Sequence, residues 1–158
     1  MKNEQAKKDA LKFLMTQKGG VLSTLAGDQP QSAFVYYDVE EDFSFSILTV
    51  IDARKRKNMQ AHNKVAFVVS TIKPPRTVEI EGVASQVTDK DIVENVLANY
   101  SDIATYQMKH AAPITKLGWE RGVAIYEIKP TWLRWSDFSD TKSKKRRDVS
   151  VVLINKHR

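Results

Sequence analysis

Two adjacent cations, Arg54 and Lys55, stand where a predicted strand gives way to a predicted short helix. The segment Leu48–Asn63 is predicted to contain the end of a strand, a tight turn and a short helix, for which Asp52 is the expected N-cap. A cation in the first helical turn is unfavourable by roughly 0.3–1 kcal/mol, because that end of the helix dipole is already positive. A bound anion reverses the effect. The pattern indicates a phosphate site at Arg54 and Lys55, with a solvated basic helix start as the alternative.

Other groupings of reactive side chains are sparse. The three histidines, His62, His110 and His157, lack the spacing of a helical metal pair, so we expect no metal site. The sequence contains no phosphate-binding P-loop and no dinucleotide-binding glycine motif. Glu79 and Glu81 share one face of a predicted strand and are either an acid/base pair or, as we favour, a solvated strand face. No catalytic residue is identified.

Composition limits the class of protein. A chain of 158 residues without cysteine fits one domain in a reducing cytoplasm, and no apolar run is long enough to cross a membrane. The net charge of +6 favours anionic partners, and part of the excess lies in Lys142–Arg147. We expect a domain over residues 1–140 and a basic tail over 141–158. Nucleic-acid binding by that tail is the less favoured interpretation, because such runs are commonly solvated.

Hydrophobic periodicity predicts strands joined by tight turns, with helices inserted between them. Expected helices cover residues 1–18, a short segment after residue 52, 90–100 and 101–112. Expected strands cover 21–25, 31–39, a segment from 43 into Leu48, 64–71 and 77–88, and then 122–128 and 131–138 as one strand or two. Gly82 predicts a bulge or a close backbone approach, Asp89 a helix N-cap and residues 149–154 an edge strand or partner contact. The fold class is α+β, a mainly antiparallel six-stranded barrel with flanking helices.

Several of these segments together resemble one family. They are GVLSTL at 20–25, GDQPQSAFV at 27–35, ILT at 47–49, ARKRKNM at 53–59, HNKVAF at 62–67 and TVEIEGVA at 77–84. Their order and spacing are similar to the pyridoxamine 5′-phosphate oxidase-like, FMN-binding split-barrel superfamily. The resemblance implies a six-stranded split β-barrel and a homodimer with two FMN sites at its interface.

The resemblance also implies roles for individual positions. In such proteins an Arg-Lys pair after the third strand holds the FMN phosphate, which here is Arg54 and Lys55. The other implied cofactor contacts are Leu48 and Thr49 near the phosphate, the second-strand backbone at Ala33, Phe34, Val35, Tyr36 and Tyr37 along the flavin ring, and Thr77 at the ring.

The sequence departs from the true pyridoxamine phosphate oxidases. Those enzymes carry an arginine and a lysine where this chain has Ala33 and Asp38, and they end in an Arg-x-His motif that is missing here. We therefore expect an FMN-dependent oxidoreductase of unknown substrate rather than an enzyme of vitamin B6 synthesis. The alternatives are a non-catalytic flavin-binding or redox- or stress-related protein, or a branch of the fold that binds the deazaflavin F420 or haem.

Overall fold

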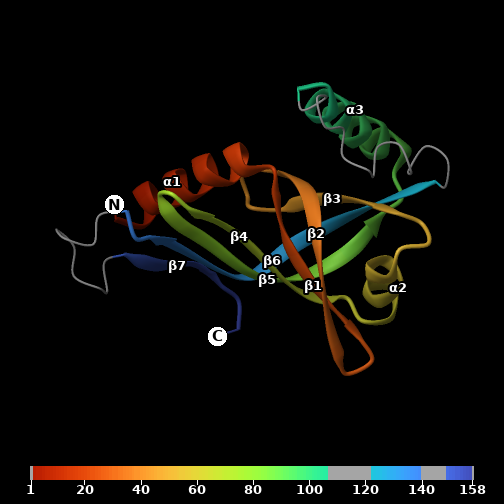
Figure 1. Ribbon diagram of the computed structural model, residues 1–158, viewed down its shortest axis with the longest axis horizontal. Coiled ribbons are helices and arrows are strands. Elements are labelled where there is room, and N and C mark those ends of the chain that lie inside the picture. Colours follow the sequence, from red (N-terminus) through yellow and green to blue (C-terminus); the bar gives the residue numbers. More distant parts are fainter. Residues whose placement is uncertain (1, 107–121, 140–148, 158) are drawn as a thin grey trace.

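The computed structural model describes residues 2–106, 122–139 and 149–157, which form one antiparallel sheet with three helices (Figure 1). The elements, in chain order, are α1 (Lys2–Gln17), β1 (Gly19–Ala26), β2 (Gln29–Val39), β3 (Phe45–Val50), α2 (Arg54–Ala61), β4 (Lys64–Ile72), β5 (Pro75–Val87), α3 (Lys90–Tyr106), β6 (Val123–Asp137) and β7 (Ser150–Asn155).

The sheet closes into a barrel because its longest strand changes neighbours halfway along. The strand order is β3-β2-β1-β4-β5-β6-β7, and β3 also pairs with β6. The first half of β6 pairs with β3, from Val123 to Ile128, whereas the second half pairs with β7, from Trp132 to Ser136. Six strands thus form the expected α+β split barrel, and β7 is an additional edge strand.

A bulge marks the place where β6 changes neighbours. The register between β5 and β6 shifts at Glu81/Gly82, so that Gly82 lies opposite Pro130. A Cβ at Gly82 would lie 2.8 Å from the Lys129 carbonyl oxygen, which is too close for any residue that has a side chain. This confirms the predicted bulge. The ambiguous segments 122–128 and 131–138 are one continuous strand, bent at the proline that cannot donate a ladder hydrogen bond.

Alternating apolar residues fill the barrel interior. Tyr37, Phe45 and Phe67 pack edge to face with ring centroids 5.4–5.5 Å apart. The Tyr37 hydroxyl donates to the Leu14 carbonyl of α1 at 2.7 Å, and burial raises the pKa of that hydroxyl. Helix α1 is thereby held against one end of the barrel core.

Three helix boundaries differ from the predictions. The N-cap of α2 is Ala53, whose side chain cannot form a capping hydrogen bond. The prediction of Asp52 as N-cap is therefore wrong. Helix α1 ends at Gln17, one residue before the predicted end, and Lys18 then adopts φ +57° immediately before β1 begins at Gly19. Helix α3 continues without a break through Tyr106, so no separate helix starts at residue 101.

Other predictions are confirmed or fall outside the described part of the chain. The Asp89 carboxylate accepts from the amides of Asp91 and Ile92, as an N-cap should. The expected C-terminal edge strand is β7. The Lys142–Arg147 run, the expected boundary near residue 140 and His110 all lie outside the described residues. Among the described helices, none is both long and apolar enough to cross a membrane.

Candidate functional site

Helix α2 and helix α1 lie at opposite ends of the molecule (Figure 1). Where α2 begins, it meets the paired strands β1 and β2 around a hollow of about 150 Å³. We call this the α2 hollow; its lining residues are Thr24, Gln31, Ser32, Ala33, Arg54 and Lys55. Three residues predicted to bind the cofactor, Ala33, Arg54 and Lys55, are thus brought to one place.

Lys55 is a half-buried cation in this hollow. Burial lowers the pKa of its ammonium group. No carboxylate in the described ranges forms an ion pair with it, and it lies in the first turn of a helix, where positive charge is already unfavourable. Both effects penalise the charged form, and an anion in the hollow would relieve both.

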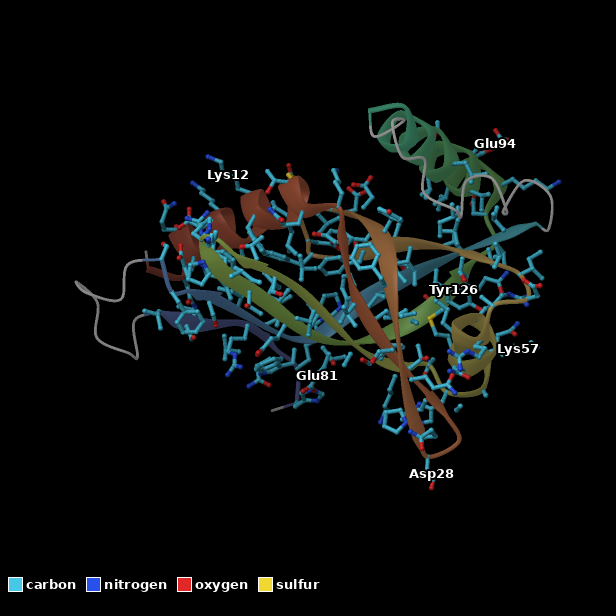
Figure 2. All side chains as sticks on the ribbon, in the orientation of Figure 1. Lys12, Asp28, Lys57, Glu81, Glu94 and Tyr126 are labelled. Atoms are coloured by element: carbon cyan, nitrogen blue, oxygen red, sulfur yellow. The ribbon has the colours of Figure 1, made fainter. Side chains whose placement is uncertain are left out.

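The next two cations of the same run point elsewhere. Arg56 donates from Nη1 to the Ile51 carbonyl at 3.0 Å, and its charge acts on Tyr126, which lies at the α2 end of the barrel (Figure 2). Burial raises the pKa of the Tyr126 hydroxyl, and the positive charge of Arg56 opposes that shift. Lys57 is exposed on the outside of α2. The basic run is therefore divided, and only its first two members line the hollow.

A buried asparagine, which the sequence analysis missed, joins α2 to both strands. The Asn58 side chain is 7% exposed, and its Nδ2 donates to Thr24 Oγ1 at 2.9 Å and to Gln31 Oε1 at 3.1 Å. Thr24 and Gln31 are cross-strand partners and both line the hollow. The sequence carries no sign of this role, because an asparagine among lysines and arginines reads as a surface residue.

The remaining predicted cofactor residues do not line the α2 hollow. Val35 and Tyr37 belong to the core, and Leu48 packs with Ile125 against the apolar side of α3. Thr49 is fully buried on β3, with its hydroxyl 3.5 Å from the Val50 carbonyl. Thr77 pairs with Ser70 and Ser136.

Phe34 and Tyr36 lie on the outer face of β2. Their rings meet edge to face with centroids 5.4 Å apart. Phe34 is 61% exposed and lies opposite Val21 of β1, which in turn lies opposite Val68 of β4. Val21 and Val68 are also exposed. We call Phe34, Val21 and Val68 the apolar row; it crosses three adjacent strands on the outside of the barrel.

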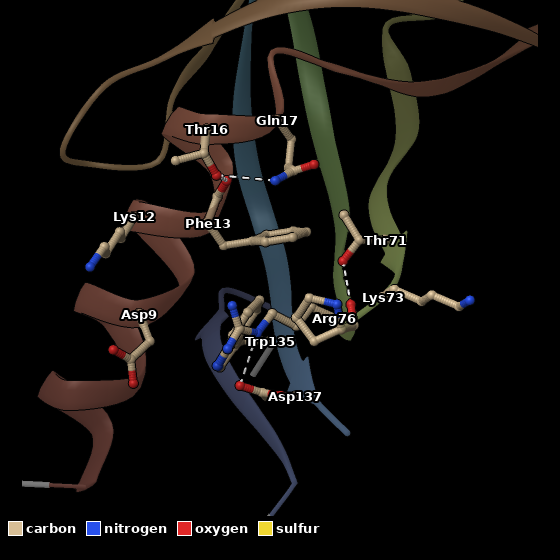
Figure 3. Close-up of a pocket in the computed structure, with 11 residues that line it drawn as sticks. Asp9, Lys12, Phe13, Thr16, Gln17, Thr71, Lys73, Arg76, Trp135 and Asp137 are labelled. Carbon is tan, nitrogen blue, oxygen red and sulfur yellow. Dashed lines mark hydrogen bonds and ion pairs between the residues drawn. The ribbon is translucent and has the colours of Figure 1, made fainter. Parts of the chain in front are cut away.

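A larger cavity of about 540 Å³ lies beside α1 (Figure 3). Its aromatic wall is Phe13 and Trp135, whose ring centroids are 5.2 Å apart. Arg76 Nε is 3.1 Å from Asp137 Oδ2, and the side chains of Lys12 and Lys73 point away from the centre (Figure 3). The central guanidinium thus already has an anionic partner, in contrast to Lys55.

The carboxylates Glu79 and Glu81 do not form an acid/base pair with each other. Glu79 forms an ion pair with Arg134, and Glu81 Oε2 lies 3.1 Å from His157 Nε2. Both contacts are on the outer face of the sheet. These positions support the interpretation of an ordinary strand face.

Comparisons with known proteins agree with this architecture. The family model described as pyridoxamine 5′-phosphate oxidase matches residues 6–135. Among curated proteins, none matches the sequence.

Solved structures share the fold at low sequence identity. General Stress Protein 26 of Bacillus anthracis is 20% identical with TM-score 0.62, and the match covers 82% of this chain and 92% of that one. A FAD-binding protein of Mesorhizobium loti is 14% identical with TM-score 0.60, covering 80% and 90%. The heme storage protein HutZ of Vibrio cholerae is 15% identical with TM-score 0.61, covering 78% and 88%.

Proposed function

This chain belongs to the pyridoxamine 5′-phosphate oxidase family, and we propose that it binds FMN through the α2 hollow and works as an FMN-dependent oxidoreductase. The observation that carries the proposal is Lys55, a half-buried cation without an anionic partner in the described chain. Structural neighbours that bind FAD or heme are consistent with a cofactor-binding fold. FMN is favoured because it has a terminal phosphate for a small, positively charged hollow.

The residues present fit a phosphate. Arg54 and Lys55 supply positive charge, and Gln31 and Thr24 supply polar groups on the facing strands. The hollow, at about 150 Å³, is smaller than the 300–1,000 Å³ typical of whole-ligand pockets, so we assign it the phosphate and not the flavin ring. The ring would then lie outside the hollow, along β2, where Phe34 and Tyr36 present aromatic surface.

In this proposal the protein binds and orients, and FMN when bound supplies the hydride-transfer chemistry. This division explains why the sequence holds no recognisable acid/base set. A role in vitamin B6 synthesis is not proposed. Ala33 leaves no cation on β2 at the hollow, and Asp38 is engaged with Lys18 across 3.6 Å.

We also propose that the protein is a homodimer joined through the apolar row. Three exposed apolar side chains in register on neighbouring strands are unfavourable in water, and contiguous patches of this kind commonly mark interfaces. The row begins at Phe34 on β2, directly after Ser32 and Ala33 of the hollow, so a partner there would also enclose the flavin ring.

Reconstitution with cofactors tests the proposed function. Purified protein is titrated with FMN, FAD, F420 and heme, followed by absorbance and calorimetry, and then assayed for NAD(P)H oxidation. We expect FMN binding, its loss in the Arg54→Ala/Lys55→Ala double variant, and full retention in Lys57→Ala, a matched cation on the exposed side of α2. Heme binding without flavin binding would refute the proposal, whereas flavin binding without turnover would restrict it to a non-catalytic flavoprotein.

The oligomeric state is tested separately. Light scattering after gel filtration should show a dimer for the wild type and a monomer for Val21→Glu, which places a charge in the middle of the apolar row. Ile72→Glu is the control, because Ile72 is 86% exposed in a different part of the sheet. A wild-type monomer, or a dimer unaffected by Val21→Glu, would contradict this interface.

A further inference from the structure

Asn58 donates both hydrogens of its side-chain amide to residues that line the α2 hollow. Its Nδ2 is the donor in both contacts, to Thr24 Oγ1 and to Gln31 Oε1. A side-chain amide has only two such hydrogens. A buried amide is costly unless it is bonded, so the asparagine is held in this one orientation by both strands at once.

The orientation of Asn58 fixes that of its partners. Gln31 accepts through Oε1, so its Nε2, with two hydrogens, is the end left to donate. Thr24 accepts through Oγ1, so its hydroxyl hydrogen is directed to some other acceptor. Both residues line the hollow beside Arg54 and Lys55.

The lining of the hollow therefore offers donors in place of acceptors. Arg54 and Lys55 can only donate, Gln31 has its amide nitrogen left to donate, and no carboxylate is among the lining residues. A fully ionised phosphate monoester is the complementary ligand, since all of its terminal oxygens accept. A neutral alcohol, as at the same end of riboflavin, accepts fewer bonds and carries no charge.

We propose that Asn58 is a positioning residue that aims the Gln31 amide into the α2 hollow as a phosphate donor, making Gln31 a specificity determinant for the phosphorylated cofactor. The inference rests on the proposed function for the identity of the cofactor, but not for the chemistry of the hollow. It goes beyond the Arg54–Lys55 pair by adding two uncharged residues with a stated direction of hydrogen bonding.

The test compares FMN with riboflavin by calorimetry in Gln31→Ala, Asn58→Ala and the double variant. We expect each single change to weaken FMN binding about 10-fold or more, the value for one hydrogen bond to a charged group. Riboflavin affinity should stay unchanged. The double variant should lose little more than Gln31→Ala, because Asn58 acts through Gln31. Gln29→Ala is the control, a glutamine two residues away whose amide bonds the Pro30 carbonyl.

A second variant guards against a folding defect at the buried position. Gln31→Glu keeps an oxygen for the Asn58 amide and replaces the outward donor by a carboxylate oxygen. It should lose more FMN affinity than Gln31→Ala while its melting temperature stays near the wild-type value. Wild-type FMN affinity in Gln31→Glu, or equal losses for FMN and riboflavin in Gln31→Ala, would overturn the inference.

Inorganic phosphate separates this inference from the proposed function. If phosphate raises the melting temperature of the wild type but not of Gln31→Ala, while FMN does not bind, the inference stands and the proposed function fails. If FMN binds equally to wild type and Gln31→Ala, the proposed function stands and the inference fails. Failure of both ligands to bind the wild type refutes both.

Discussion

Replacing Lys55 by methionine should stabilise the free protein and at the same time weaken cofactor binding. Methionine keeps an unbranched chain of similar length in the hollow but removes the charge that burial penalises. A cation in the first helical turn costs about 0.3–1 kcal/mol. The gain in unfolding free energy should thus be about 0.5–1 kcal/mol, or about 1–4 °C in melting temperature for a chain of this size.

The effect on affinity has the opposite sign. A hydrogen bond between charged groups contributes about 1.5–3 kcal/mol, so FMN binding should weaken about 10- to 150-fold in Lys55→Met. Thermal unfolding without ligand and calorimetry with FMN measure the two quantities on one sample. Lys57→Met, on the exposed side of α2, should change neither. A Lys55→Met protein that is less stable than wild type and binds FMN equally well would refute the electrostatic reasoning.

The same reasoning fixes the pH dependence. The pKa of Lys55 in the free protein lies below its ordinary value of 10.5, so the folded state holds that proton less tightly than the unfolded state. The penalty is fully present below the folded pKa and disappears as pH rises toward 10.5. The stability advantage of Lys55→Met should therefore shrink in alkali. FMN binding to the wild type should take up protons near the lowered pKa and weaken above it, and calorimetry in buffers of different ionisation enthalpy detects that uptake.

Three further substitutions test the elements that support the site. Tyr37→Phe removes the 2.7 Å hydrogen bond to the Leu14 carbonyl, and denaturant unfolding should show a loss of about 1 kcal/mol. Gly82→Ala places a Cβ 2.8 Å from the Lys129 carbonyl oxygen and should cost about 1–3 kcal/mol in the same assay. Asp89→Ala removes the N-cap of α3 at a cost of about 0.5–2 kcal/mol, visible as faster amide exchange in the first turn of that helix; unchanged exchange would contradict the capping role.

The fold was predictable because its strands carry their own periodicity. Alternation predicted that Glu79 and Glu81 share one face of a strand, and on β5 they lie on the outer face while Val78 and Ile80 between them are buried. What the sequence left open was long-range pairing. Gly82 marked the irregularity in the sequence, but no local pattern encodes that β6 pairs with β3 along its first half and with β7 along its second half.

The errors in helix boundaries have local physical causes. Asp52 has the side chain preferred at an N-cap, but the backbone of Ala53 takes the extended conformation that defines the position, φ −65° and ψ 141°. Similarly, the left-handed residue that follows helix α1 is Lys18 and not Gly19 or Gly20, although glycine adopts that conformation most readily. Gly20 serves another purpose, since a Cβ would lie 2.7 Å from the Val68 carbonyl oxygen.

The candidate site also contains residues that the sequence could predict and residues that it could not. The sequence predicted Arg54 and Lys55 in the first turn of a helix, an electrostatically unfavourable place for two cations, and the structure has them there. Asn58, Gln31 and Thr24 were not predictable, because their roles exist only once α2 lies against the hairpin.

The geometry of the α2 hollow follows from the register of one hairpin. Gly27 and Asp28 form a two-residue turn, with Gly27 at φ +64°, which aligns Ala26 with Gln29 and therefore Thr24 with Gln31. Because side chains alternate along a strand, a slip of one residue would turn Gln31 to the outer face and leave Asn58 with one partner. Barrel and hollow thus depend on the same register: the alternation that directs apolar side chains into the core also directs Gln31 and Thr24 toward the start of α2. The hairpin register thus shapes the hollow without a ligand, and a bound anion would meet Arg54 and Lys55 already in place and offset the cost of holding them at the positive end of a helix.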